Sequence, residues 1–232
     1  MPTIASRPKI SKAAVPFATI GELCDRLGGV SAHRVVADPA PGTATDRDYA
    51  RRDGRSVTGA ICELADGTLL EKPMGASESV LAQEIAFCLR LYLRDHPIGY
   101  VGGEAYLVQL APGLVRVPDI SVTMWKGQPA GLTSSDAVTK EIPALVVEVV
   151  SRSNTAREMA RKVGEYFHAG VRVVWIVNPQ RRSAAVYTGV ATVSRLDAAG
   201  TLTAEAVLPG FALPLATAFA WLPKATVRRR KP

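Results

Sequence analysis

Residues 145–150, with the sequence LVVEVV, constrain the fold of this chain more than any other segment. A nearly continuous apolar run of this length is typical of a strand in a sheet that is covered on both faces. Glu148 would be buried inside it, and a lone ionised carboxylate there costs several kcal/mol unless it is paired or bound to a cation. Glu148 is therefore either paired with an arginine at the end of the strand or part of a functional site.

Helical and strand-like patterns alternate around this segment. Apolar residues recur at helical spacing over residues 78–95. Thr155 and Glu158 form a capping-box pattern that opens a second helix, and Gly170 is suited to end it. The strands expected are a hairpin of residues 61–64 and 68–70, runs at 106–110, 115–124, 145–150 and 171–177, and short strands at 184–187, 192–196 and 202–207. This order predicts an α/β fold with a mixed sheet covered on both faces, followed by a C-terminal β-meander.

The chain divides into three parts by composition. Residues 1–56 are rich in Ala, Pro, Gly, Asp and Arg and show helical spacing only over residues 20–27, which predicts an arm with one short helix. Residues 57–222 carry the α/β pattern, and residues 223–232 form a basic tail. No segment has the pattern of a signal peptide or of a membrane-spanning helix, so we expect a cytoplasmic protein that does not enter a membrane.

The net charge of +7 comes mostly from the tail, which holds five basic residues. The rest of the chain has 23 basic and 21 acidic residues and is nearly neutral. A basic tail can bind a phosphate backbone without sequence preference, or it can be a solvated end. The three cysteines are widely spaced without a CxxC pair, which argues against a disulfide framework and a cysteine zinc site.

Two acids are the strongest candidates for a metal site. Asp119 follows Pro118 at the start of a strand-like run, where it is either a turn residue or a ligand. Together with Glu148 on a neighbouring strand it could bind Mg²⁺, which takes one or two carboxylates plus waters and substrate oxygens.

Two further residues of the predicted helices could join these acids. Lys162 shares a helix face with Glu158 and Tyr166, so it either pairs with Glu158 on a solvated surface or points across the sheet towards Glu148. In the second arrangement its charge would stabilise a phosphate or orient a water. Glu78, at the start of the first helix, is either a third acid of the site or a favourable charge at a helix N-terminus.

Several segments in a fixed order resemble the "Uma-two" group of restriction-endonuclease-like proteins in the PD-(D/E)XK nuclease superfamily. The resemblance covers roughly residues 60–222. It is carried by LVVEVVS at 145–151 with Ser153 and Thr155, by Lys162, Tyr166 and GVRVVWIVNP at 170–179, by residues 67–71, by RVPDISV at 116–122 and by LPGFALPL at 208–215.

This resemblance implies an αβββαβ nuclease core and Mg²⁺- or Mn²⁺-dependent hydrolysis of phosphodiester bonds in DNA. Asp119 and Glu148 would be the metal ligands, with the backbone carbonyl of Val149 as a further ligand. Relatives with this core often pair as homodimers, because cutting two strands takes two sites.

The sequence departs from the pattern of the superfamily at two points. The superfamily places a lysine two residues after the glutamate, where this chain has Val150. Lys162 is the natural substitute and Lys72 a weaker one. Near the start of the first helix, where many relatives have a histidine, this chain has Ser77, Glu78 and Ser79.

The sequence therefore supports two functions from different classes. The first is a metal-dependent DNA endonuclease, because both acids are present at positions where an unbound acid is costly. The second is a non-catalytic module of nuclease fold that binds nucleic acid or a protein partner, because Val150 replaces the lysine and the body of the chain is nearly neutral.

Overall fold

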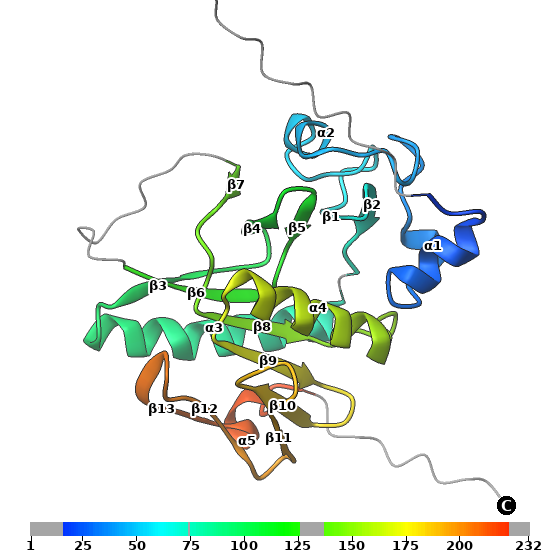
Figure 1. The fold of residues 1–232 in the computed structure, drawn as a ribbon. Helices are drawn as coiled ribbons and strands as arrows, with labels where there is room; N and C mark the ends of the chain where they lie inside the picture. The colour runs from blue at the N-terminus through cyan, green and yellow to red at the C-terminus, as the bar shows by residue number, and fades with distance from the viewer. Residues whose placement is uncertain (1–15, 74, 126–136, 223–232) are drawn as a thin grey trace, which may run out of the picture.

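The computed structural model describes residues 16–73, 75–125 and 137–222, so the basic tail lies outside the described residues. A six-stranded sheet crosses the centre of the molecule (Figure 1). Its strands are β3 (Gly99–Gly102), β6 (Ile120–Met124), β8 (Leu145–Val149), β9 (Val173–Asn178), β10 (Ser183–Tyr187) and β11 (Val193–Leu196). They lie in the order β11-β10-β9-β8-β6-β3, and only β8 and β9 are parallel, which makes the sheet mixed.

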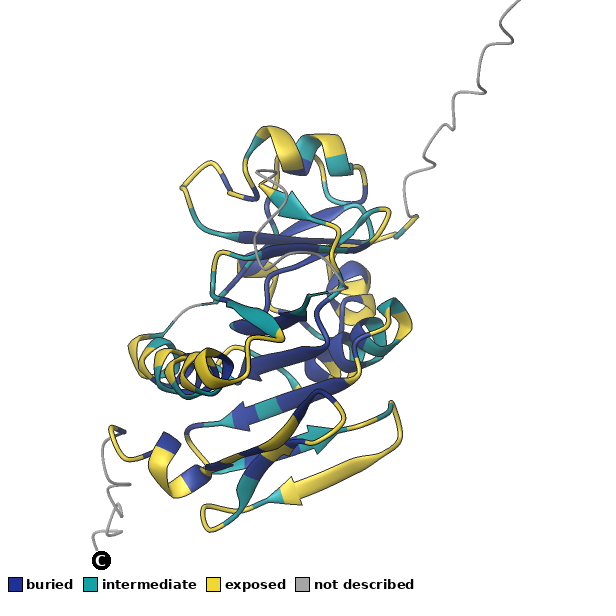
Figure 2. Cartoon of the chain, turned by 90° about the vertical axis from the view of Figure 1, so that its left-hand side faces the viewer, coloured by how far each residue is buried: buried dark blue, intermediate teal, exposed yellow. Residues whose placement is uncertain are grey.

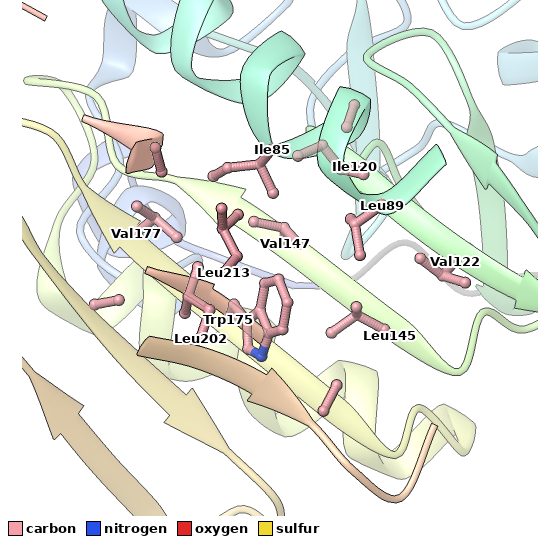
Figure 3. Close-up of a cluster of buried hydrophobic side chains, with 14 of the residues drawn as sticks. Ile85, Leu89, Ile120, Val122, Leu145, Val147, Trp175, Val177, Leu202 and Leu213 are labelled. Carbon is pink, nitrogen blue, oxygen red and sulfur yellow. The ribbon is translucent and has the colours of Figure 1, made fainter. Parts of the chain in front are cut away.

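Two helices cover opposite faces of this sheet, as the apolar run in β8 requires. Side chains alternate across a strand, so Leu145 and Val147 pack towards α3 (Ala76–Asp95) while Val146 packs towards α4 (Ala156–Ala169). Figure 3 shows the α3 side, where Ile85, Val147 and Trp175 meet in one core. Because Glu148 alternates with Val147, it falls on the side of α4.

The ends of α4 follow from its sequence, with one difference from the capping box that we expected. The Thr155 hydroxyl accepts a hydrogen bond from the Glu158 amide at 3.0 Å, and Gly170 ends the helix with φ +105°. The Glu158 side chain, however, binds Arg34 at 2.7 Å. The capping box is therefore only half formed, because a buried arginine competes for the glutamate.

A second, five-stranded sheet lies next to the first. Its strands are β1 (Cys62–Ala65), β2 (Thr68–Glu71), β4 (Leu107–Ala111), β5 (Leu114–Arg116) and β7 (Val138–Thr139), in the order β2-β1-β5-β4-β7. The predicted hairpin is confirmed, since β1 and β2 join through Asp66 and Gly67, both at positive φ. The predicted single strand over residues 115–124 is wrong. It is split around Pro118, which has no amide hydrogen to donate, and its halves β5 and β6 belong to different sheets.

The expected αβββαβ core is present, but its first strand differs from the prediction. In chain order the core is α3, β3, β6, β8, α4 and β9. The run expected as first strand is β4, which belongs to the second sheet, and the true first strand is β3. Gly99 and Gly102 weaken the strand pattern of β3, so it escaped sequence analysis.

The described part of the N-terminal region packs on the rest of the protein and contains a second helix that sequence analysis missed. Besides α1 (Ile20–Arg26) and a 3₁₀ helix at Ala32–Arg34, it forms α2 (Asp46–Arg51). A full capping box of Thr45 and Asp48 starts α2 inside a segment whose Pro and Gly residues predicted irregular chain. Buried residues of this region line two cores beside the second sheet (Figure 2): Leu23, Leu27 and Val30 in one, Val36, Ala44 and Tyr49 in the other.

The C-terminal strands form a meander only in part. The antiparallel run β9-β10-β11 lies at one edge of the six-stranded sheet. Strands β12 (Thr201–Ala204) and β13 (Leu208–Pro214) pair separately, and α5 (Leu215–Ala218) follows them. Leu202, Leu213 and Phe219 are buried in the core below α3, which keeps this second hairpin apart from the edge strand β11.

No helix in the described ranges has the length and hydropathy that crossing a membrane requires.

Gly28 provides a test of how the N-terminal region is fixed. It has φ +98°, and a Cβ there would lie 2.7 Å from the Cα of Glu158 on α4. Gly59 has φ +83° and nothing within 4 Å of such a Cβ. We expect Gly59→Ala to lower the free energy of unfolding by about 1 kcal/mol through backbone strain, and Gly28→Ala by about 3 kcal/mol because overpacking adds to it. Urea unfolding measures both, and equal losses would contradict the close packing of Gly28 on α4.

Candidate active site

Two acids meet where β6 and β8 run side by side. Ile120 pairs with Val147 in the antiparallel register, so the preceding residue, Asp119, lies opposite Glu148. Residues directly opposite in an antiparallel pair point to the same face. A carboxylate oxygen of Asp119 accepts a hydrogen bond from the Val149 amide at 2.6 Å, which fixes Asp119 at the end of β8. The sheet itself therefore brings together the two acids that sequence analysis selected.

Glu148 lies under α4 and is only 3% exposed. Its carboxylate accepts hydrogen bonds from the Lys162 ammonium at 3.2 and 3.3 Å and a short one from the Tyr166 hydroxyl. Of the two arrangements considered for Lys162, the structure has the one that crosses to Glu148. The buried carboxylate is thus paired with a lysine from the helix above it, and not with an arginine at the strand end.

Lys162 is also bound to a second buried acid, Glu63 of β1. The Lys162 ammonium lies 2.8 Å from one oxygen of Glu63, and Arg116 of β5 donates to the other at 2.9 Å. Arg116 extends the chain of charges to Glu165, 2.6 Å away. Glu63 itself has no exposed surface. We call Glu63, Arg116, Glu148, Lys162 and Glu165 the buried charge network.

Burial and neighbouring charges shift the two glutamates of this network in opposite directions. Burial alone would raise the pKa of Glu63, but Lys162 and Arg116 lower that pKa to about 2. Burial raises the pKa of Glu148, and Lys162 opposes this rise while the nearby charges of Asp119 and Glu63 add to it. Burial alone would lower the pKa of Lys162, but the charges of Glu148 and Glu63 outweigh it and raise that pKa. Glu63 therefore has two cationic partners that outweigh its burial, whereas Glu148 shares Lys162 with Glu63 and burial outweighs that one ion pair.

A second lysine, Lys72, forms an ion pair with Asp119. The Nζ atom of Lys72, just after β2, lies 2.7 Å from a carboxylate oxygen of Asp119. The angle of this ion pair is not that of a hydrogen bond, so within the described ranges Lys72 Nζ has no hydrogen-bond acceptor. Its side chain is 4% exposed, while that of Asp119 is 15% exposed. Asp119 is thus the partly exposed member of this pair, and the Lys72 ammonium beside it is buried.

Glu78 is not part of this group of acids and lysines. Its carboxylate accepts hydrogen bonds from Gln180 at 3.0 Å and from Ser77 at 2.8 Å. It stands on the wall of an open cavity of about 670 Å³. The other lining residues are Pro73, Gly75, Ala76, Ser77, Val80, Ser151, Arg152, Ser153, Trp221 and Leu222. Neither Asp119 nor Glu148 lines this cavity; its lining residues nearest to the site in sequence are Pro73, which follows Lys72, and Ser151, three residues after Glu148.

Sequence analysis gave no role to Glu63 or Arg116. The signal for Glu63 was present, because it is an acid inside the apolar strand β1, as Glu148 is inside β8. Arg116 had no such signal, since an arginine at the end of a short strand is usually exposed. Only the pairing of β1 with β5, and the packing of α4 over them, shows that Glu63, Arg116 and Lys162 belong together.

No three or more His, Cys, Asp or Glu side chains in residues 16–73, 75–125 and 137–222 lie close enough together to hold a metal ion. The acids near one another at the site are Asp119 and Glu148, and Mg²⁺ commonly binds through one or two carboxylates with waters in its other positions. The donor set therefore fits a hard divalent cation and does not fit zinc, which takes three or four His, Cys or carboxylate ligands.

Comparisons with known proteins agree with this architecture. Residues 48–216 match the family model Uma2, described as "Putative restriction endonuclease". A crystal structure from Anabaena variabilis, titled as a putative nuclease belonging to DUF820, is similar with a TM-score of 0.62 at 18% sequence identity. The similarity covers 70% of this chain and 92% of that chain. No curated protein gives a significant match.

Replacing Glu63 tests the buried charge network through its pH dependence. Glu63 has a lowered pKa in the folded state, so the stability it contributes is present above about pH 4.5 and is lost as the pH falls towards 2. We expect Glu63→Gln to lower the free energy of unfolding at pH 7 by about 3 kcal/mol, because Lys162 and Arg116 lose a buried partner. The difference from wild type should shrink as the pH falls below 4.5.

The matched control for this prediction is Glu22→Gln, which removes an exposed acid paired with Arg26. Its effect should stay below about 1 kcal/mol at every pH, as is usual for surface ion pairs. Urea unfolding between pH 3 and pH 8 measures both variants. A Glu63→Gln effect that does not change with pH would contradict the assigned charges.

Proposed function

The chain belongs to the Uma2 family of restriction-endonuclease-like proteins, and we propose that it is a metal-dependent endonuclease that hydrolyses phosphodiester bonds of DNA. The observation that carries the proposal is the pairing of Asp119 with Glu148 on adjacent strands, each beside a buried lysine. Charges concentrated in this way suit a reaction in which negative charge develops on phosphate oxygens.

Asp119 and Glu148 are the proposed metal ligands, with Mg²⁺ or Mn²⁺ as the cation. Support comes from the chemistry of the donors, which are hard oxygens, and from their position opposite each other on adjacent strands. When bound, such a cation supplies positive charge to the attacking and leaving oxygens of a phosphodiester. The Val149 amide and Tyr166 hold the two carboxylates in place for it.

The two lysines have different proposed roles. Lys162 is buried between Glu148 and Glu63, so it keeps Glu148 ionised and oriented. Lys72 is buried beside the more exposed acid, so it suits holding Asp119 ionised and placing positive charge next to it. Together they replace the lysine that the superfamily has at the position of Val150.

The open cavity lined by Glu78, Ser151 and Arg152 is the proposed entry for the nucleic acid. Arg152 and Ser153 are exposed on its wall, and both can contact a phosphate backbone. Glu78 shares this wall, so we place it near the substrate and not among the metal ligands. A homodimer would supply two such sites, one for each strand of a duplex.

A non-catalytic module that binds nucleic acid or a protein partner is the alternative. It is favoured by Val150 in place of the usual lysine and by the nearly neutral body of the chain. It differs from the first proposal in one respect, because binding would then occur without cleavage.

Metal binding is tested by thermal unfolding with and without Mg²⁺ or Mn²⁺. A ligand that binds only the folded state at 100 times its Kd stabilises by about 2.7 kcal/mol, which raises the Tm of a chain of this size by about 5–10 °C. We expect this rise for wild type and for the surface variant Glu22→Gln, and none for Asp119→Asn. An equal rise in Asp119→Asn would contradict the proposed ligands, and no rise in wild type at millimolar metal would contradict the site itself.

Cleavage is tested on supercoiled plasmid and on branched DNA with Mg²⁺ or Mn²⁺. We expect wild type to nick, and Asp119→Ala and Glu148→Ala to lose at least 100-fold in rate because each removes a metal ligand. Lys72→Met and Lys162→Met should each lose at least 10-fold in rate and also lower the Tm, because each leaves a buried carboxylate without its cation. Glu78→Ala should lose much less than either acid variant. DNA binding without cleavage by wild type would support the non-catalytic module instead.

A further inference from the structure

The long helix α3 has two apolar faces, of which the fold uses one. Leu81, Ile85, Leu89 and Leu93 are buried against the sheet and the C-terminal hairpin. Val80, Phe87 and Leu91 are 50%, 58% and 49% exposed. These three residues are seven and four positions apart, so they form a second stripe along the outer side of α3. Figure 2 shows this helix end-on, at the left.

Charged residues on the same stripe are separated by sign along the helix. Glu84 lies between Val80 and Phe87, and Arg94 lies one turn after Leu91. In the part of the chain that the structure describes, neither Glu84 nor Arg94 has an ion pair or a hydrogen bond from its side chain. The acid is in the first half of α3 and the arginine in the last turn, and both are without partners.

This pattern is complementary to itself when one helix is reversed. A two-fold axis at the level of residue 89, with two α3 helices packed antiparallel, places Phe87 of one copy opposite Leu91 of the other. The same operation places Glu84 of each copy opposite Arg94 of the other, so the interface contains two such pairs. In an isologous interface the same patch must match its own copy, and few sequences satisfy that for both charge and apolar contacts.

We infer that the α3 stripe, formed by Val80, Glu84, Phe87, Leu91 and Arg94, is the surface through which two copies of this chain form a dimer. The inference deepens the proposed homodimer by naming its interface. An apolar stripe flanked by unpaired charges of both signs suits a protein surface better than a nucleic acid, which would need a basic face. Asp95, which is also exposed, lies on the same flank of α3 as Glu84, next to Arg94.

The test is the mass of the full chain in solution, measured by analytical ultracentrifugation over a range of concentrations. Wild type should be a dimer, and Glu84→Arg or Arg94→Glu alone should raise the dissociation constant more than tenfold, because each turns two attractive pairs into two repulsive ones. The double variant Glu84→Arg/Arg94→Glu should restore the wild-type dissociation constant. Phe87→Asp should give a monomer.

Mixing the two single variants provides a sharper test. A copy with Glu84→Arg carries two arginines on the stripe and a copy with Arg94→Glu carries two glutamates. Each alone should therefore be a monomer, while an equimolar mixture should form a heterodimer with both pairs satisfied. Arg195→Glu and Val190→Asp, which change exposed residues on and beside β11, should leave the dimer intact.

The result that would overturn the inference is a wild type that stays monomeric at 100 μM, or a dimer that Glu84→Arg and Phe87→Asp leave unchanged. These measurements do not depend on cleavage. A dimer without nuclease activity would therefore contradict the proposed function alone, and an active monomer would contradict the interface alone.

Discussion

The ammonium group of Lys162, held between Glu63 and Glu148, joins the parts of this protein that form the site. Its partners come from β1 and β8, which belong to different sheets, and Lys162 itself comes from α4. Charges buried this deeply are tolerated only when each has a partner. The second sheet, the helix and the central sheet are therefore fixed relative to one another by charge as well as by apolar packing.

The same network explains how the chain can lack the lysine that the superfamily places after the glutamate. Side chains at positions 148 and 150 point to the same face of β8, the face that α4 covers. A lysine on α4 can thus reach the Glu148 carboxylate from above, where a lysine at position 150 would have reached it from the strand. Glu148 therefore has a positive charge beside it, from Lys162, although position 150 is a valine.

The elements that could be predicted from the sequence are those whose own pattern is strong. Residues 145–150 and 171–177 are apolar runs, the helix Ala76–Asp95 repeats apolar residues at helical spacing, and Asp66-Gly67 specifies a hairpin. Sequence analysis failed where contacts far apart in the chain decide the structure. Strand β3 is fixed by pairing with β6, and Glu158 leaves its cap for Arg34, 124 residues away.

In the candidate site, too, some residues could be selected from the sequence, whereas the roles of others depend on contacts that only the structure shows. Asp119 and Glu148 could be selected from the sequence because an acid in or beside an apolar strand needs a partner. The rule applies equally to Glu63, yet the structure separates the two glutamates by their surroundings. Glu63 has no exposed surface and two full cationic partners, which lower its pKa to about 2. Glu148 has a raised pKa and lies beside Asp119, which reaches solvent. Glu63 thus has the contacts of a structural charge inside the network, whereas Glu148 shares Lys162 with it and lies opposite Asp119, the acid that reaches solvent.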